Sequence, residues 1–227
     1  MIPLLVKFPT RSRPERFRYA LELLVKHAVR PKDLHFLFTL DNDDPHIAEV
    51  ERAIVETAAS GPAIHCTVMH GTSTGKIHAV NRDLPEFTLP WQTVVVASDD
   101  MHATPAWDQW IIEAMAKFYP DGDGCLWFAD GFQKDICTIP CMGRAYFDRF
   151  GYIYNPAYQS VFVDDEQTHV GVKLGKLTKI DHVLFRHDHP AWNSSLKPDA
   201  LYQRNEAPAV WKHDETIYRA RHAAGFP

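Results

Sequence analysis

The order of apolar and polar positions predicts strands and helices that alternate through the first half of the chain. An apolar run at residues 4–8 predicts a strand, and residues 14–29 predict an amphipathic helix after it. The helix prediction rests on apolar residues spaced three or four apart, Phe17, Leu21, Leu24 and Ala28. The same reading predicts strands at 35–40, 64–69 and 93–97 and helices at 46–59, 75–83 and 107–118.

Strands that alternate with helices favour right-handed crossovers and a mainly parallel sheet, with ligands beyond the carboxyl ends of the strands. The second half is less regular, with strand-like segments at 125–129 and 136–140. Its last part is polar and rich in Arg and His, which we interpret as an ordered extension. We expect one α/β domain at 1–190, with a more regular half at 1–100 and a less regular half at 101–190, followed by an extension at 191–227.

Composition narrows the classes of protein to consider. The 227 residues include 24 Lys+Arg and 29 Asp+Glu, a formal charge of −5, and 45% are hydrophobic. A negative net charge argues against a protein whose main role is to coat nucleic acid or an anionic membrane. No run approaches the roughly 20 apolar residues of a membrane span, the N-terminus lacks the pattern of a secretory signal, and the four cysteines form no C-x-x-C pair. These features predict a cytoplasmic protein with reduced thiols.

Two adjacent acids follow the most apolar predicted strand, in the sequence Ser98-Asp99-Asp100. Adjacent carboxylates at the carboxyl edge of a sheet repel each other, and a divalent cation relieves that repulsion. One acid would then hold Mg²⁺ or Mn²⁺ while the other accepts a hydrogen bond from a sugar hydroxyl. The alternative is an ordinary helix N-cap.

Two further segments at the same edge suit a nucleotide. Asp41 follows the second strand, where it would contact a nucleobase edge or a ribose, while Asp43 and Asp44 suit the start of the next helix. Lys76 follows Gly75 at the start of another predicted helix, a position that suits a diphosphate. The phosphate-loop pattern fails there, because three residues separate the two glycines and Ile77 follows the lysine.

The second half contributes two candidate clusters. Asp164, Asp165 and Glu166 are consecutive acids, and in a partly dry cleft one of them would have the raised pKa that a general base needs. A solvated acidic turn is the alternative. His187 and His189 point the same way in a strand-like segment and are candidate metal ligands, although such a pair also suits a surface.

These segments together resemble a nucleotide-sugar glycosyltransferase of the GT-A fold, similar to glycosyltransferase family 2. The resemblance covers roughly residues 4–189 and lies in the order of the following motifs: TRSRP at 10–14, DNDDP at 41–45, GKIHAVN at 75–81, SDDM at 98–101, DDE at 164–166 and HDHP at 187–190. It implies a Rossmann-like, mainly parallel sheet flanked by helices, in which residues 1–100 form the nucleotide-binding half and residues 101–190 the acceptor-side half.

The resemblance also implies roles for individual residues. Those implied to bind the nucleotide-sugar are Thr10, Arg11, Arg13, Asp41, Lys76, Asn81 and Asp99. Those implied to bind Mn²⁺ or Mg²⁺ are Asp100 with His187 or His189. The catalytic base is implied to be one of Asp164, Asp165 and Glu166.

Several features depart from the usual family pattern. Ser98 stands where the first acid of a D-x-D motif is usual, and the second acidic cluster is D-D-E in place of Glu-Asp. No Q-x-x-R-W-type motif follows, so a processive polysaccharide synthase is not implied.

The function implied is a metal-dependent, inverting hexosyltransferase that uses a nucleoside-diphosphate sugar, with a UDP-sugar favoured. A nucleotidyltransferase is one alternative, although residues 10–14 lack the glycine of its usual phosphate loop, and a non-catalytic nucleotide or sugar binder is another. The sequence leaves four classes of acceptor: a saccharide, a small molecule, a protein or a hydroxylated DNA base. It does not indicate the oligomeric state. For DNA, the supporting feature is a basic C-terminal segment with Arg204, Lys212, Arg219 and Arg221.

Overall fold

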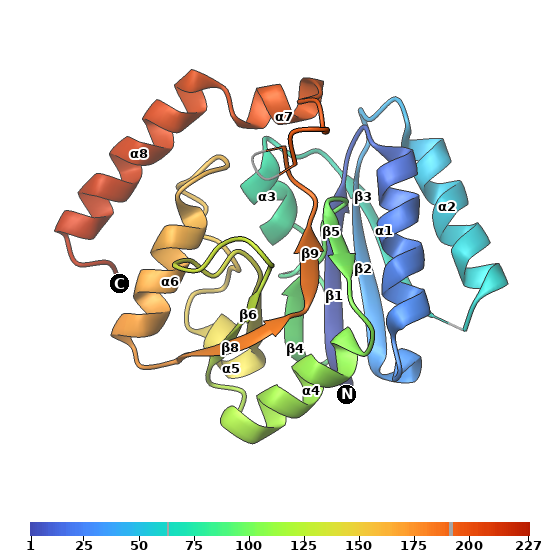
Figure 1. The fold of residues 1–227 in the computed structure, drawn as a ribbon, viewed down its shortest axis with the longest axis horizontal. Helices are drawn as coiled ribbons and strands as arrows, with labels where there is room; N and C mark the ends of the chain where they lie inside the picture. Colours follow the sequence, from blue (N-terminus) through green and yellow to red (C-terminus); the bar gives the residue numbers. More distant parts are fainter. Residues whose placement is uncertain (63, 191–192) are drawn as a thin grey trace.

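The protein folds around one seven-stranded sheet with helices on both faces (Figure 1). The structure, a computed structural model, describes residues 1–62, 64–190 and 193–227. The strands of the sheet lie in the order β3-β2-β1-β4-β7-β6-β8. Their bounds are β1 Ile2–Thr10, β2 Leu34–Asp41, β3 His65–Gly71, β4 Trp91–Val96, β6 Cys125–Ala129, β7 Pro140–Gly143 and β8 Leu177–Val183. A separate two-stranded ribbon pairs β5 (Met101–Ala103) with β9 (Phe185–His187).

The mainly parallel sheet predicted from the sequence is confirmed. β1 pairs in parallel with β2 and β4, and β2 pairs in parallel with β3. β7 is antiparallel to both of its neighbours, whereas β6 and β8 are parallel. The carboxyl ends of β1, β2 and β4 therefore meet at one edge of the sheet. The strand order reverses between β1 and β4, and in parallel sheets a ligand commonly binds at such a topological switch point.

Helices cover the two faces of this sheet and divide the core into two clusters. Their bounds are α1 Pro14–His27, η1 Pro31–Asp33, α2 Ile47–Ser60, α3 Lys76–Asn81, α4 Trp107–Phe118, α5 Arg144–Asp148, α6 Val163–Lys173, α7 Ala200–Asn205 and α8 Pro208–Ala223. Leu4, Val6 and Phe8 of β1 pack with apolar residues of α1, α2 and α4 on one face. Leu5 faces the other side and packs with α3, α5 and α6, as the period of two in a strand requires.

One predicted strand is shifted. Residues 136–140 look strand-like in sequence, but β7 begins only at Pro140. The segment before it is held by side chains instead of a strand partner, because Cys137 N donates to Thr168 Oγ1 and Thr138 Oγ1 donates to Asp130 Oδ2. The three consecutive acids at 164–166 form the first turn of α6.

The C-terminal extension is bonded to the rest of the protein, with α7 above the strand ends at the top of the view and α8 beside α6 (Figure 1). The fully buried carboxylate of Asp214 on α8 accepts hydrogen bonds from the main-chain N–H groups of Gln159 (2.9 Å), Ser160 (2.8 Å) and Val161 (2.9 Å). Asp214 thus joins α8 to the turn that leads into α6. The division between a domain and an extension at residue 190 stays a prediction, and residues 191 and 192 lie outside the described residues.

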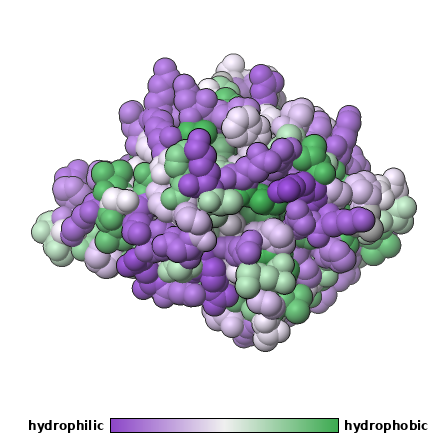
Figure 2. Space-filling model, turned by 90° about the horizontal axis from the view of Figure 1, so that it is seen from below, coloured by the Kyte–Doolittle hydropathy of each residue, from purple (hydrophilic) through white to green (hydrophobic). Residues whose placement is uncertain are grey.

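The outer surface is mixed in character. On the face seen from below, where the N-terminus lies, hydrophilic and apolar residues are interspersed (Figure 2), which is ordinary for a protein surface. Within the described ranges, every helix is too short or too polar to pass through a bilayer.

Asp214→Ala is expected to lower the free energy of unfolding by about 3 kcal/mol, because it leaves three main-chain donors without their acceptor. Urea denaturation measures this. Glu215→Ala is the matched control, since Glu215 is a half-exposed neighbour whose side chain, among the described residues, bonds to Arg219 on its own helix and to no other. Equal stability of the two variants would contradict the anchoring role of Asp214.

Candidate functional site

A pocket of about 250 Å³ lies at the carboxyl ends of β1, β2 and β4. The loop after β4 and the first turn of α6 form its walls, and residues 201, 202 and 204–206, in and just after α7, line it from the C-terminal extension. Among the residues implied by the resemblance, those that line it are Thr10, Arg11, Arg13, Asp41, Lys76, Asp99, Asp100, Asp164, His187 and His189. The fold therefore brings most of the candidate residues, which are far apart in sequence, around one space.

The arginines that follow β1 are held by carboxylates. Arg11 donates to Asp41 at 3.0 Å and to both carboxylate oxygens of Asp43 at 2.6 and 3.0 Å. Arg13 donates to Asp99 at 3.1 Å and, through two nitrogens at 2.7 Å each, to Asp199. Because Asp199 also caps α7 by accepting from Tyr202 N, Arg13 links the acid after β4 to the C-terminal extension.

Asp99 and Asp100 differ in their surroundings although they are adjacent. Burial, together with the charge of Asp100, raises the pKa of Asp99 to about 6 despite the Arg13 contact. Burial also opposes the charge of Asp100, but His187, a hydrogen bond from Ser98 and the charge of Lys76 outweigh it, and the pKa of Asp100 falls below its ordinary value. Asp100 is thus the more strongly anionic of the pair.

His187 lies between two carboxylates. Its Nε2 is 3.9 Å from Asp100 Oδ2 and its Nδ1 is 3.6 Å from Asp130 Oδ2. Asp130 is buried, and although burial opposes its charge, His187 and hydrogen bonds from Phe132 N, Gln133 N and Thr138 Oγ1 lower its pKa to about 2. The ring of His189 lies 5.0 Å from that of His187. Sequence reasoning missed Asp130, which follows β6.

The three acids of α6 point in different directions. Asp164 lines the pocket, and burial together with Asp165 raises its pKa. Asp165 is half-buried and lies outside the pocket lining. Glu166 is 3% exposed and accepts bonds from Asn155, Tyr158 and Arg221 at 2.7 to 3.0 Å, so it ties α6 to α8. The structure brings only Asp164 of the three into the pocket.

Lys76 and Asn81 both belong to α3, but only Lys76 lines the pocket. The charge of Lys76 acts to lower the pKa values of Asp100 and Asp164, although burial and Asp165 raise the pKa of Asp164 overall. Asn81 Nδ2 donates to Tyr154 O at 2.6 Å, and its Oδ1 accepts from the N–H groups of Ile153 and Tyr154. The side chain of Asn81 therefore holds the 153–154 segment and does not line the pocket.

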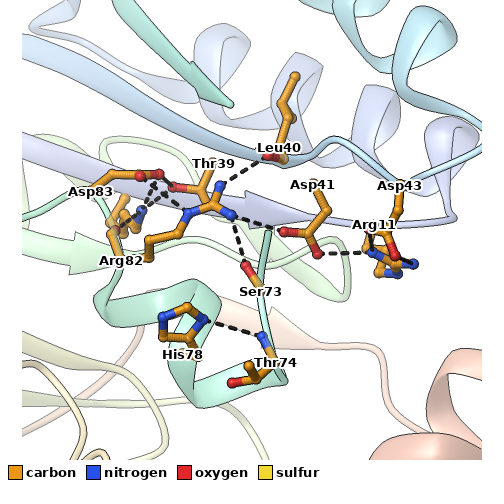
Figure 3. A network of polar contacts seen from close by, with 11 residues as sticks. Arg11, Thr39, Leu40, Asp41, Asp43, Ser73, Thr74, His78, Arg82 and Asp83 are labelled. Atoms are coloured by element: carbon orange, nitrogen blue, oxygen red, sulfur yellow. Dashed lines mark hydrogen bonds and ion pairs between the residues drawn. The ribbon is translucent and has the colours of Figure 1, made fainter. Parts of the chain in front are cut away.

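Behind Asp41, a polar network that sequence reasoning missed runs into the core (Figure 3). The guanidinium of Arg82 donates to Asp41 Oδ1 at 3.1 Å, Ser73 Oγ at 3.1 Å and Leu40 O at 2.9 Å. Arg82 Nε donates to Asp83 at 3.1 Å. Arg82 thus joins the acid at the end of β2 to groups that lie deeper beneath the pocket.

The innermost member of this network is Lys7, whose side chain is fully buried in β1. Its Nζ donates to Thr39 Oγ1 and, at 2.7 Å, to Arg82 O. Burial lowers the pKa of Lys7 from 10.5 to about 7, although the nearby Asp83 acts to raise it. The signal that could have found it is a lysine inside the otherwise apolar run at residues 4–8.

The depressed pKa of Lys7 makes stability depend on pH. Between pH 7 and 10.5 the unfolded chain binds a proton that the folded chain releases, so stability is lost as pH falls through this range. We expect the free energy of unfolding of the wild type, relative to Lys7→Met, to rise between pH 7 and 9 by roughly 1 kcal/mol per pH unit. Urea denaturation checks this, with the exposed Lys26→Met as control. A difference that stays constant with pH would contradict the depressed pKa.

The described residues contain no group of three or more His, Cys, Asp or Glu side chains arranged to hold a metal ion. Asp100 and His187 nevertheless supply one carboxylate and one imidazole on the same side of the pocket. A divalent cation that binds nucleotides is commonly held by one or two protein groups together with phosphate oxygens. The donor set present therefore fits a cation that is bound jointly with a diphosphate.

Comparison with known proteins shows relatives by structure alone. No protein-family model and no curated protein sequence matches the chain. The mannosyltransferase PcManGT from Pyrobaculum calidifontis, in complex with GDP-Man and Mn²⁺, is similar with a TM-score of 0.64 and 15% identity over 99% of this chain and 76% of that one. Residues 1–349 of S. aureus TarS give a TM-score of 0.61 and 12% identity over 82% of this chain and 60% of that one.

The same part of TarS in complex with UDP-GlcNAc gives a TM-score of 0.59 and 13% identity, over 88% of this chain and 63% of that one. The chain thus spans less than two thirds of the TarS chains that it resembles. At these identities the likeness establishes the fold. The protein has the fold of these structures, the GT-A fold.

Proposed function

We propose that the protein is a metal-dependent glycosyltransferase that moves a hexose from a nucleoside-diphosphate sugar to an acceptor hydroxyl, with inversion at the anomeric carbon. The observation that carries the proposal is the placement of Asp100, His187, Lys76 and Asp164 around one pocket of a GT-A fold. An anion-binding group, a cation-binding pair and a candidate base are the parts that such a transfer needs.

The end of the pocket at Asp41 suits a nucleobase. Arg11 and Arg82 bond to the two oxygens of Asp41, which fixes its carboxylate in place as an acceptor. A fixed acceptor favours bases with a ring N–H, uracil and guanine, over cytosine and adenine, whose corresponding ring nitrogen is itself an acceptor. PcManGT with GDP-Man and TarS with UDP-GlcNAc both carry donors of the favoured kind. We favour UDP, with GDP as the alternative.

Asp99 and Lys76 extend the nucleotide site toward the sugar. Asp99 is held by Arg13 at 3.1 Å and suits a ribose hydroxyl, which can donate to it. Lys76 has no hydrogen bond or ion pair within 4 Å among the described residues, so its ammonium group is available to the diphosphate.

Asp100 and His187 would hold Mn²⁺ or Mg²⁺ together with the diphosphate oxygens. When bound, the cation would neutralise the charge that develops on the departing nucleoside diphosphate. Asp130 lies 3.6 Å from Nδ1 of His187 and Asp100 lies 3.9 Å from Nε2, so Nε2 is the ring nitrogen on the side of the proposed cation. His189 lies beside this pair and lines the same pocket.

Asp164 is the base that the geometry favours. Its raised pKa suits a group that takes a proton from the acceptor hydroxyl as that oxygen attacks the anomeric carbon. Glu166 is occupied by Asn155, Tyr158 and Arg221, and Asp165 lies outside the pocket lining. We therefore assign the base to Asp164.

Asp164→Asn is expected to lower turnover about 100-fold or more, because general-base catalysis contributes at least that much, while donor affinity stays within a few-fold of wild type. Donor hydrolysis with UDP- and GDP-hexoses measures turnover, and calorimetry measures donor affinity. Asp165→Asn is the matched control and should turn over normally. Normal turnover by the Asp164 variant would show that the base lies elsewhere.

Asp100→Asn is expected to abolish donor hydrolysis that depends on added Mn²⁺, because the cation loses its carboxylate ligand. The measurement is the hydrolysis rate as Mn²⁺ is titrated into metal-free protein, with EDTA-treated wild type for comparison. Full activity of the wild type in EDTA would refute the metal assignment.

A further inference from the structure

Lys7 carries a buried amine that the chemistry proposed above does not use. Its side chain has no exposed surface, and it lies in the middle of the sheet between β2 and β4. Burying a charged group is costly unless it is paired and hydrogen-bonded. A methionine would fill a similar space without that cost, so the contacts of Lys7 indicate what its amine does there.

Those contacts converge on Arg82. Lys7 Nζ donates to the main-chain carbonyl of Arg82 at 2.7 Å, at the point where α3 ends. It also donates to Thr39 Oγ1, which in turn donates to Asp83 Oδ2 at 2.5 Å. Asp83 accepts from Arg82 Nε at 3.1 Å. Lys7 therefore fixes the backbone of Arg82 directly and its side chain through Thr39 and Asp83. Figure 3 shows Thr39, Asp83 and Arg82 side by side.

The backbone at this point is strained, which shows that it needs holding. Asp83 has a φ of 72°, a left-handed conformation that few residues other than glycine adopt. Lys7 pairs with Asp83 Oδ2 at 3.6 Å and bonds to the preceding carbonyl. These contacts stabilise a turn that aims the guanidinium of Arg82 at Asp41, which lines the pocket.

We propose that Lys7 is a positioning residue for nucleobase selection, which acts through Arg82 on the carboxylate of Asp41. The inference rests on the proposed nucleotide site. It adds the physical reason why that site would prefer one base over another. Lys7 does not line the pocket. Its effect on the ligand passes through two side chains, and it should therefore alter selectivity between bases more than affinity for the phosphates.

Calorimetric binding of UDP and CDP in the presence of Mn²⁺ tests this, with GDP and ADP as the second pair. UDP and CDP share ribose and diphosphate, so the ratio of their dissociation constants reports the base alone. Lys7→Met is expected to weaken UDP binding and lower the preference for UDP about tenfold while CDP binding stays unchanged, with the same shift for GDP over ADP if guanine is the preferred base.

Two further variants bracket this result. Gly71→Ala should reproduce it, because a Cβ at Gly71 would lie 2.9 Å from a terminal nitrogen of Arg82 and displace that side chain directly. Leu5→Met should leave the preference unchanged, since Leu5 is a buried residue on the same face of β1 within the apolar cluster. If Lys7→Met alone does not fold, Lys7→Met with Asp83→Asn removes both charges and is expected to show the same loss.

The outcomes separate the inference from the function on which it rests. A wild-type preference that persists in folded Lys7→Met or in the double variant overturns the inference alone. Equal affinity of the wild type for all four diphosphates also overturns it, because there is then no preference for Lys7 to support. A wild-type protein that binds none of them overturns the proposed function and this inference together.

Discussion

The site depends on one electrostatic constraint, which is that the parallel sheet gathers carboxylates at one edge and each of them needs a cation. Asp41 meets Arg11 and Arg82, Asp99 meets Arg13, and Asp100 lies nearest His187. Each pairing joins segments that are far apart in the sequence. Because carboxylates that approach one another without such partners raise one another's pKa, these basic groups are what allow the carboxylates to gather at this edge, and their hydrogen bonds fix the direction in which Asp41 and Asp99 point.

The same constraint explains why the C-terminal extension belongs with the site. Asp199 occupies two nitrogens of Arg13 while a third contacts Asp99, so the start of α7 and the acid after β4 share one guanidinium. Asp214 and Arg221 then attach α8 to the turn and helix that carry Asp164. The extension thus contacts both the nucleotide side and the base side of the pocket.

The sequence predicted the first half of the fold well, because β1 and β2 are apolar runs that are buried along most of their length, and α1 carries its apolar residues three or four apart on one buried side. It predicted that Asp41, Asp99 and Asp100 would meet, since strand ends in a parallel sheet share an edge. It could not choose among Asp164, Asp165 and Glu166, because α6 begins after a left-handed Phe162 that no local pattern announces, and successive residues of a helix turn point in different directions. Arg82 was missed for a related reason, since its direction depends on the strained turn at Asp83.

The measurement that tests the central claim most directly is calorimetric binding of UMP, UDP and UTP, and of the guanosine series, to metal-free protein with and without Mn²⁺. The account predicts that one diphosphate binds most tightly and that its tight binding requires Mn²⁺, because the cation is held jointly by Asp100, His187 and the diphosphate. Tightest binding of a triphosphate, or equal binding with and without Mn²⁺, would contradict it.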